Sequence, residues 1–180
     1  MIRSKSIQVL FAAILCVLSC GSILSVQAAQ QNAGKDTVLK ASEITNKIFP
    51  ERVFYRGQTA PVQMRNTGAV HFADDMYILA GLVDNSGYST GVREKYQGYF
   101  ITEVPIEING QSLKPGAYGI GFVEGSKFIV TDLGSNNLLE ISGKRDAEIK
   151  HPVPLQILAA QDGNYRLYLG RDFVELHRVK

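Results

Sequence analysis

Residues 99–133, YFITEVPIEINGQSLKPGAYGIGFVEGSKFIVTDL, decide the fold of this chain. Their first part alternates apolar and polar side chains, and the apolar positions are Phe100, Val104, Ile106 and Ile108. A period of two is typical of a half-buried β-strand. The Asn109-Gly110 pair that follows tolerates positive φ at both positions, as the type I′ turn of a β-hairpin requires. A two-residue loop pairs Ile108 with Gln111 and Ile106 with Leu113, so Leu113 joins the same apolar face.

Two further turns follow in the same stretch. Pro115 and Gly116 fit the central positions of a type II turn, which predicts that the chain reverses direction there. A two-residue turn at Gly125-Ser126 then pairs Phe122 with Ile129 in the next hairpin. The stretch as a whole therefore predicts consecutive antiparallel strands.

Gly119 and Gly121 lie on one face of the strand between these two turns and leave that face bare. Glycines in this position allow a backbone or a ligand to approach closely, or allow the sheet to bend. We interpret the pair as a sharp bend of the sheet, since glycine-rich corners are common in strongly curled sheets.

The run Leu113-Lys114-Pro115-Gly116-Ala117-Tyr118 resembles a known turn-to-strand signature, L-x-P-G-x-Y. This signature is found in transthyretin-like and carboxypeptidase-regulatory modules, and the chain is more broadly similar to exported bacterial β-sandwich proteins. The resemblance implies a fold class and carries no functional residue, because the same turn serves sandwiches of many functions.

Outside this stretch the chain reads as short strands separated by turns, one of which is expected at residues 66–68. The expected strands are residues 53–55, 60–64, 69–72, 76–83, 136–141, 155–160, 165–169 and 173–179. Their spacing predicts an all-β fold, a single antiparallel β-sandwich of hairpin-linked strands over residues 42–180, with a small closed β-barrel as the alternative. Residues 76–83 are apolar throughout, which predicts a central strand covered on both faces. One short N-terminal helix is expected over residues 42–49, with Ser42 as its N-cap and Pro50 ending it.

The N-terminus has the pattern of a secretory signal peptide over residues 1–29. Arg3 and Lys5 precede an apolar run that is too short for a transmembrane anchor, and small residues follow it. Residues 30–41 are polar and are expected to form a flexible leader. The chain is therefore predicted to be exported, to the periplasm or the exterior. A lipoprotein with an acylated Cys20 is the alternative, and it is the one route by which membrane attachment is expected.

Charge and cysteine content narrow the classes of partner. Residues 1–29 hold two basic and no acidic residues, so their removal lowers Lys+Arg from 19 to 17, against 17 Asp+Glu. A neutral domain is not expected to bind nucleic acid or acidic membranes, which are held by clustered positive charge. Both cysteines, Cys16 and Cys20, lie inside the signal segment, so no disulfide is expected in the exported domain. The scattered His71, His151 and His177 form no metal motif, and neither a metal nor a cofactor is predicted.

One catalytic pattern is present. Residues 87–91, GYSTG, match the G-x-S-x-G nucleophile elbow, with Ser89 as the candidate nucleophile. Asp132 or Asp146, followed by His151 or His177, would complete the order of a serine–acid–histidine triad. An elbow needs a parallel sheet built from βα units, which the chain does not supply. A small secreted serine hydrolase using Ser89 is therefore kept as an alternative, and a plain loop is the preferred interpretation.

The binding candidates are Tyr88, Tyr96 and Tyr99 in the glycine-rich segment 84–99. Tyrosines offer an apolar face and a hydroxyl together, which suits a glycan or a protein partner of the envelope. In the competing interpretation, Tyr96 and Tyr99 cover the edge of the sandwich and only Tyr88 is exposed. A barrel that binds a small apolar ligand would instead show a cavity lined by Tyr118, Ile120 and Phe122. The preferred function is an exported, non-catalytic binding or structural module of the cell envelope.

Overall fold

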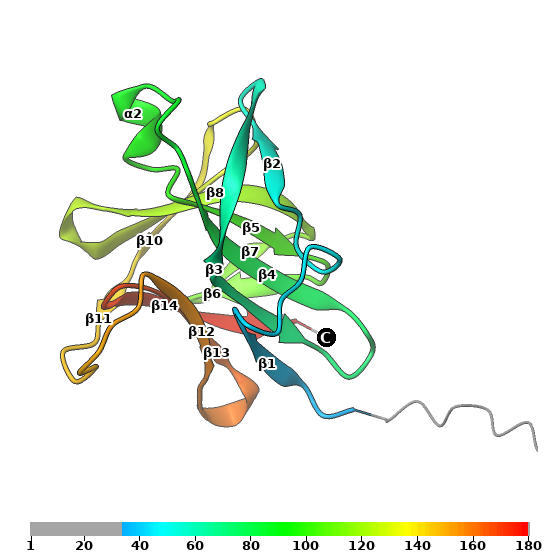
Figure 1. Ribbon diagram of the computed structural model, residues 1–180. Coiled ribbons are helices and arrows are strands. Elements are labelled where there is room, and N and C mark those ends of the chain that lie inside the picture. Colours follow the sequence, from blue (N-terminus) through cyan, green and yellow to red (C-terminus); the bar gives the residue numbers. More distant parts are fainter. Residues whose placement is uncertain (1–33, 180) are drawn as a thin grey trace, which may run out of the picture. The chain divides into compact units, whose positions relative to one another are not determined.

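The computed structural model describes residues 34–179, which form two antiparallel β-sheets packed face to face (Figure 1). The larger sheet has the order β1-β3-β4-β5-β8-β9-β10, and β2 also pairs with β3. Its strands are β1 (Thr37–Lys40), β2 (Arg52–Tyr55), β3 (Gln58–His71), β4 (Tyr77–Val83), β5 (Gly98–Thr102), β8 (Gly116–Val123), β9 (Lys127–Thr131) and β10 (Asn137–Ser142).

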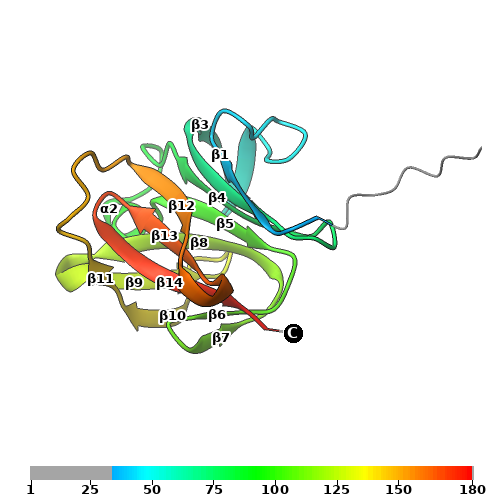
Figure 2. The same ribbon diagram turned by 90° about the horizontal axis from the view of Figure 1, so that it is seen from below.

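The smaller sheet has the order β12-β13-β14-β6-β7, and β11 also pairs with β14. Its strands are β6 (Ile106–Ile108), β7 (Gln111–Leu113), β11 (Lys144–Arg145), β12 (Leu155–Ala159), β13 (Tyr165–Leu169) and β14 (Asp172–Arg178). The helical segments are single turns, α2 (Thr90–Arg93), η1 (Glu124–Ser126) and η2 (Gln161–Gly163). Figure 2 shows β12, β13 and β14 lying across β5 and β8. The predicted antiparallel sandwich is confirmed. The alternative of a closed barrel is wrong, because the two sheets remain separate.

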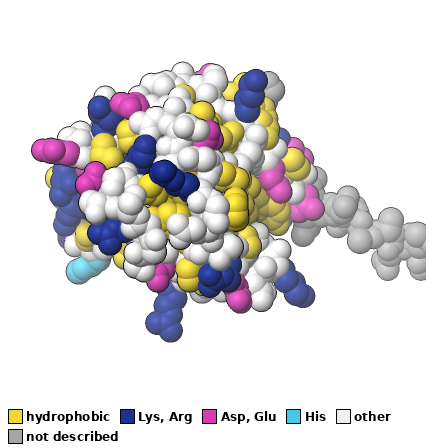
Figure 3. Space-filling model, turned by 90° about the horizontal axis from the view of Figure 1, so that it is seen from above, with side chains coloured by type: hydrophobic (Ala, Val, Ile, Leu, Met, Phe, Trp, Pro, Cys, Tyr) yellow, Lys and Arg dark blue, Asp and Glu magenta, His cyan; other side chains and the backbone are white. Residues whose placement is uncertain are grey.

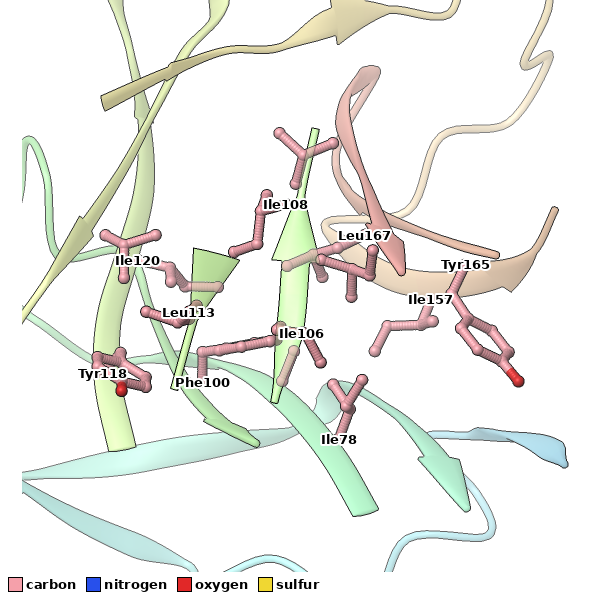
Figure 4. Packing of buried hydrophobic residues seen from close by; sticks show 14 of the residues in the cluster. Ile78, Phe100, Ile106, Ile108, Leu113, Tyr118, Ile120, Ile157, Tyr165 and Leu167 are labelled. Atoms are coloured by element: carbon pink, nitrogen blue, oxygen red, sulfur yellow. The ribbon is translucent and has the colours of Figure 1, made fainter. Parts of the chain in front are cut away.

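The main core lies between the two sheets (Figure 4). It joins Ile78, Phe100 and Ile120 of the larger sheet to Ile106 and Leu167 of the smaller one, and each of these side chains is fully buried. A second apolar cluster covers the opposite face of the larger sheet, and there Leu79 and Val83 pack under residues from segments 44–62 and 88–99. The prediction of a central strand covered on both faces is therefore confirmed for β4, since alternate residues enter different cores.

The β6–β7 hairpin has the predicted register. Ile108 pairs with Gln111 and Ile106 with Leu113 across the turn, where Asn109 and Gly110 both have positive φ. Asn109 also fixes the hairpin in the sandwich: its side-chain oxygen accepts from the Glu175 backbone N–H at 2.8 Å, and its side-chain nitrogen donates to the Ser142 carbonyl at 2.8 Å.

The hairpin belongs to a different sheet from the strands on either side of it. β5 and β8 are neighbours in the larger sheet, so the chain leaves that sheet after Thr102 and returns to it at Gly116. Thr102 is the polar residue that interrupts the apolar positions between Phe100 and Val104; it is buried at the first corner and donates to the Val104 carbonyl at 2.6 Å. The alternation of apolar and polar residues is therefore interrupted at the place where the chain passes from the larger sheet to the smaller one.

The predicted reversal at residues 114–117 is wrong, because this segment is the second corner between the sheets. Gly116 does not have positive φ and already begins β8. The Tyr118 hydroxyl donates to the Lys114 carbonyl at 2.8 Å, and a Cβ at Gly116 would lie 2.8 Å from that hydroxyl. Glycine is needed here to make room for the tyrosine that closes the corner, and not for turn geometry.

The β8–β9 hairpin is shifted by one residue from the predicted register. Its loop holds the three residues Glu124–Ser126, with Gly125 and Ser126 at positive φ, and Phe122 pairs with Phe128 instead of Ile129. Since neighbouring residues of a strand point to opposite faces, this shift exchanges the faces assigned to β9.

Three local predictions are also corrected. Part of the expected leader forms β1, which pairs with the second half of β3. The expected turn at residues 66–68 is a bulge within β3, where the register shifts between Val62 and Thr67. Residues 42–49 form hydrogen-bonded turns and not a regular helix, with one helix-type bond from the Phe49 N–H to the Thr45 carbonyl. The predicted signal peptide and Cys20 lie outside the described residues.

Candidate functional site

Ser89 does not stand in the setting of a nucleophile elbow. It is exposed and directly precedes the single turn α2, and its side chain makes no hydrogen bond within residues 34–179. The strand before it, β4, belongs to an antiparallel sheet. His177 is hydrogen-bonded to Asn164, and the Asp132 carboxylate accepts three bonds from its own loop. The structure does not bring the parts of the candidate triad together.

The three tyrosines predicted to face a ligand lie in the interior. Tyr88 is 7%, Tyr96 0% and Tyr99 6% exposed, so the prediction of an exposed tyrosine surface is wrong. Tyr96 stacks face to face on Tyr55, with ring centroids 3.6 Å apart, and Tyr88 meets both rings edge-on. The Tyr88 hydroxyl donates to the Tyr55 carbonyl at 3.0 Å. These rings form the second core, because segment 84–97 folds down onto the larger sheet.

Gly119 and Gly121 leave one face of β8 without side chains at their positions, and segment 84–97 packs directly against that face. A Cβ at Gly119 would lie 2.6 Å from the Tyr55 ring, and a Cβ at Gly121 would lie 2.7 Å from the Lys95 carbonyl oxygen. Of the interpretations open from the sequence, the close approach of another backbone is therefore correct at Gly121, and the preferred sharp bend is not needed to explain either glycine.

The Tyr96 hydroxyl has no hydrogen-bond partner within the described part of the chain. Burial, the largest cause, and the neighbouring Tyr88 together raise the pKa of this phenol far above its ordinary value. A neutral, buried hydroxyl of this kind is not a proton donor for surface chemistry. Tyr118 and Ile120 likewise belong to the packed main core, with Phe122 packed against it, so these three residues do not line a ligand cavity.

A cleft of about 600 Å³, with several charged residues in its lining, opens where the β3–β4 turn, the β12–β13 turn and the end of β14 meet. It is lined by Asp36, Ala73, Asp74, Asp162, Gly163, His177 and Arg178. Segments distant in sequence thus bring three carboxylates, one imidazole and one guanidinium to one hollow. With the histidine neutral, carboxylates outnumber cationic groups, and the field in the cleft is negative.

Arg178 and Asp74 make the rigid wall of the cleft. Two guanidinium nitrogens of Arg178 donate to the two Asp74 oxygens at 2.9 and 2.6 Å, and the guanidinium lies 4.5 Å from the centre of the Phe72 ring. The bidentate bond from Arg178 lowers the pKa of Asp74, and the same bond raises the pKa of Arg178. The positive charge is thus already paired within the protein.

Asp36 joins the opposite wall to both sheets. Its Oδ1 accepts from the Ala73 backbone N–H at 3.0 Å, and its Oδ2 accepts from the Tyr165 hydroxyl at 3.0 Å. Burial and this bond raise the pKa of Tyr165 to about 12. Asp36 precedes β1, so the segment expected to be a leader supplies a wall of the cleft.

His177 and Asp162 present the open acceptors of the cleft. The His177 Nδ1 lies 2.8 Å from the Asn164 side-chain oxygen. With the Asn164 oxygen assigned as the acceptor, Nδ1 is the donor, and a neutral ring then has its acceptor at Nε2. Asp162 is exposed at positive φ in η2, and its carboxylate makes no hydrogen bond within residues 34–179.

A smaller hollow of about 210 Å³ lies beside α2 and is less suited to a ligand. Most of its polar groups are already paired, since Lys95 donates to the Asn137 side chain at 2.9 Å and Lys127 lies 3.3 Å from Glu140; the exposed Glu94 carboxylate makes no hydrogen bond within residues 34–179. Within residues 34–179 no group of three histidine, cysteine or acidic residues could hold a metal ion. None of the helices in that range is long and apolar enough to cross a membrane.

Comparison of the chain with protein-family models, with curated proteins and with solved structures gave no match.

Sequence reasoning missed the cleft because its residues belong to three separate turns and strand ends. Asp162-Gly163-Asn164 and Asp74-Asp75 both read as turns, and the structure confirms turns at both places. A turn signal gives no indication of which other turn will lie beside it, so no local pattern could have grouped Asp36 with Arg178.

Proposed function

We propose that this protein is an exported, non-catalytic binding module of the cell envelope, and that the cleft between the β3–β4 turn, the β12–β13 turn and the end of β14 holds a glycan rich in hydroxyl groups. The observation that supports this proposal is the surplus of open acceptors on a rigid frame. Asp162 and His177 line the cleft, and neither the Asp162 carboxylate nor the His177 Nε2 has a hydrogen-bond partner within the described residues, while Arg178 and Asp74 are bonded to each other.

The chemistry of the cleft selects among ligands. Sugar hydroxyls donate hydrogen bonds to carboxylates and to imidazole nitrogen, and these are the groups that the cleft offers. The three carboxylates against one guanidinium favour an uncharged or amine-bearing glycan and repel an anionic one. The frame is preorganised, because its ion pair and the Asp36 bonds exist without a ligand, so ordering costs little on binding.

Calorimetric titration with three soluble oligosaccharides tests this proposal. We expect binding of a glucosamine oligomer, weaker binding of its N-acetylated form, and no binding of an oligogalacturonate. Asp162→Asn together with His177→Ala should weaken binding of the glucosamine oligomer by at least about 30-fold, because two hydrogen bonds, one of them to a charged group, contribute about 2 kcal/mol or more.

The matched control is Glu124→Gln, which removes one exposed carboxylate from the η1 loop, outside the cleft lining. This variant should bind the oligomer like the parent protein. Equal affinity for all three oligosaccharides, or equal weakening by Glu124→Gln and by the cleft variant, would contradict the proposed site.

A further inference from the structure

The β2–β3 hairpin presents an aromatic side chain between arginines. Along β2, Val53 and Tyr55 point inward, while Arg52 and Phe54 point outward, and Arg56 follows in the turn. Phe54 is 54% exposed, the highest value among the large hydrophobic residues described. In Figure 1 the hairpin stands out from the sandwich at the top of the molecule. A large apolar side chain that is exposed at a projecting position can mark a binding surface.

Among the residues that the structure describes, the positive charges of this hairpin have no carboxylate partner. Within residues 34–179, no acidic group lies within ion-pair distance of Arg52, Arg56 or Arg65, and the Arg52 guanidinium donates to the Thr59 hydroxyl at 3.0 Å instead. Arg65 is exposed further along β3. Glu51 directly precedes β2 in the sequence, and its carboxylate accepts a long bond from Asn46 at 3.4 Å.

The local charge differs from that of the chain as a whole. Basic and acidic residues balance in residues 30–180, whereas residues 52–65 hold three arginines and no acidic residue. Figure 3 looks onto this end of the molecule, where basic and acidic side chains are interspersed among hydrophobic ones. A chain with balanced charges can therefore still carry a local excess of positive charge on one hairpin.

We propose that the outer face of this hairpin, formed by Arg52, Phe54 and Arg56, docks on the surface of an anionic phospholipid bilayer. Arginines pair with lipid phosphates through bidentate hydrogen bonds, and a phenyl ring between them can enter the boundary between headgroups and acyl chains. A bilayer surface satisfies the charge and the exposed ring at the same time. Few basic residues are involved, so docking is weak, reversible and dependent on ionic strength.

The absence of tryptophan from the chain gives a local reporter. Phe54→Trp in the full-length protein places a single indole on the proposed surface. We expect its fluorescence to shift to shorter wavelength when vesicles of phosphatidylcholine with phosphatidylglycerol are added, and to remain unchanged with phosphatidylcholine alone. Added salt should reverse the shift. Leu138→Trp, at another exposed position on β10, should not respond to either vesicle.

Charge reversal on this background separates the hairpin from general electrostatics. Arg52→Glu with Arg56→Glu should raise the lipid concentration needed for half of the shift by at least about tenfold. Lys114→Glu with Lys150→Glu makes the same change in net charge at two exposed residues elsewhere and should leave it unaltered. Circular dichroism of each variant confirms folding.

Three outcomes would overturn the proposal: no shift with anionic vesicles, an equal loss of the shift in both double variants, or an equal shift with soluble polyglutamate. The last result would show that the hairpin docks on acidic chains and not on a bilayer. None of these outcomes bears on the cleft, so the two proposals fail independently.

Discussion

Gly119→Ala tests whether the buried tyrosines can pack against the larger sheet only because residue 119 has no side chain. An ideal Cβ there would lie 2.6 Å from the Thr131 hydroxyl oxygen and 2.6 Å from the Tyr55 ring, whereas ordinary contact begins at 3.4 Å. Both neighbours would have to move by about 0.8 Å, and both are buried and bonded to each other at 2.7 Å.

The expected loss of stability follows from these contacts. Overpacking of a core costs about 1–3 kcal/mol, and weakening a buried hydrogen bond costs about 1 kcal/mol more. Gly119→Ala should therefore lower the free energy of unfolding by about 2–4 kcal/mol, a large fraction of the 5–15 kcal/mol of a typical domain. Urea denaturation followed by near-ultraviolet circular dichroism of the tyrosines measures this change.

Gly91→Ala is the matched control, because a Cβ at Gly91 would meet nothing within 4 Å and the residue lies inside α2. This substitution should leave stability unchanged or raise it by up to about 1 kcal/mol through helix propensity. If Gly119→Ala unfolds within about 0.5 kcal/mol of the parent protein, the sheet is not closely covered at this position and the reasoning is refuted.

Three further predictions concern single side chains. Tyr96→Phe removes a buried hydroxyl that has no partner within residues 34–179 and should be neutral or stabilising. Tyr55→Phe breaks the hydrogen bond to Thr131 and should lower the free energy of unfolding by about 1 kcal/mol. Urea midpoints that rank the two variants in reverse would contradict this prediction. Asn109→Gly keeps a residue that tolerates positive φ but loses the side-chain hydrogen bonds to β14 and β10. Thermal unfolding should show that the free energy of unfolding falls by about 1–3 kcal/mol. An unchanged midpoint would mean that these bonds do not hold the hairpin in place. The pKa of Tyr165 is raised to about 12, so the folded state retains a proton that the unfolded chain releases from about pH 10. The urea midpoint should therefore fall as the pH rises from about 10 through 12. Tyr165→Phe should make the midpoint depend less on pH over this range.

Local turn chemistry explains what was predicted correctly. The β6–β7 register followed from Asn109-Gly110 alone, because a two-residue turn allows only one pairing of its neighbours. The predicted β8–β9 register was wrong because Ser126 also has positive φ and belongs to a three-residue loop. Serine adopts positive φ less often than glycine or asparagine, so its presence did not indicate this conformation.

The candidate site shows a different limit. Tyr88, Tyr96 and Tyr99 lie in a glycine-rich segment with the composition of a binding loop, and the same composition suits a segment that folds flat over a bare sheet. The choice between these outcomes depended on Gly119 and Gly121, which lie 20 or more residues further along the chain, on a different strand.

The sequence by itself determined the class of fold, because the period of hydrophobicity and the turn residues act over a few neighbours and are written locally. It also determined most strand positions and the two-sided burial of β4. Only the tertiary structure decided that β6 and β7 leave the larger sheet, that the tyrosines form a second core, and that Asp36, Asp162 and Arg178 share a cleft. These features depend on which strands and turns meet across the sandwich, and that pairing is settled by the packing of the whole domain.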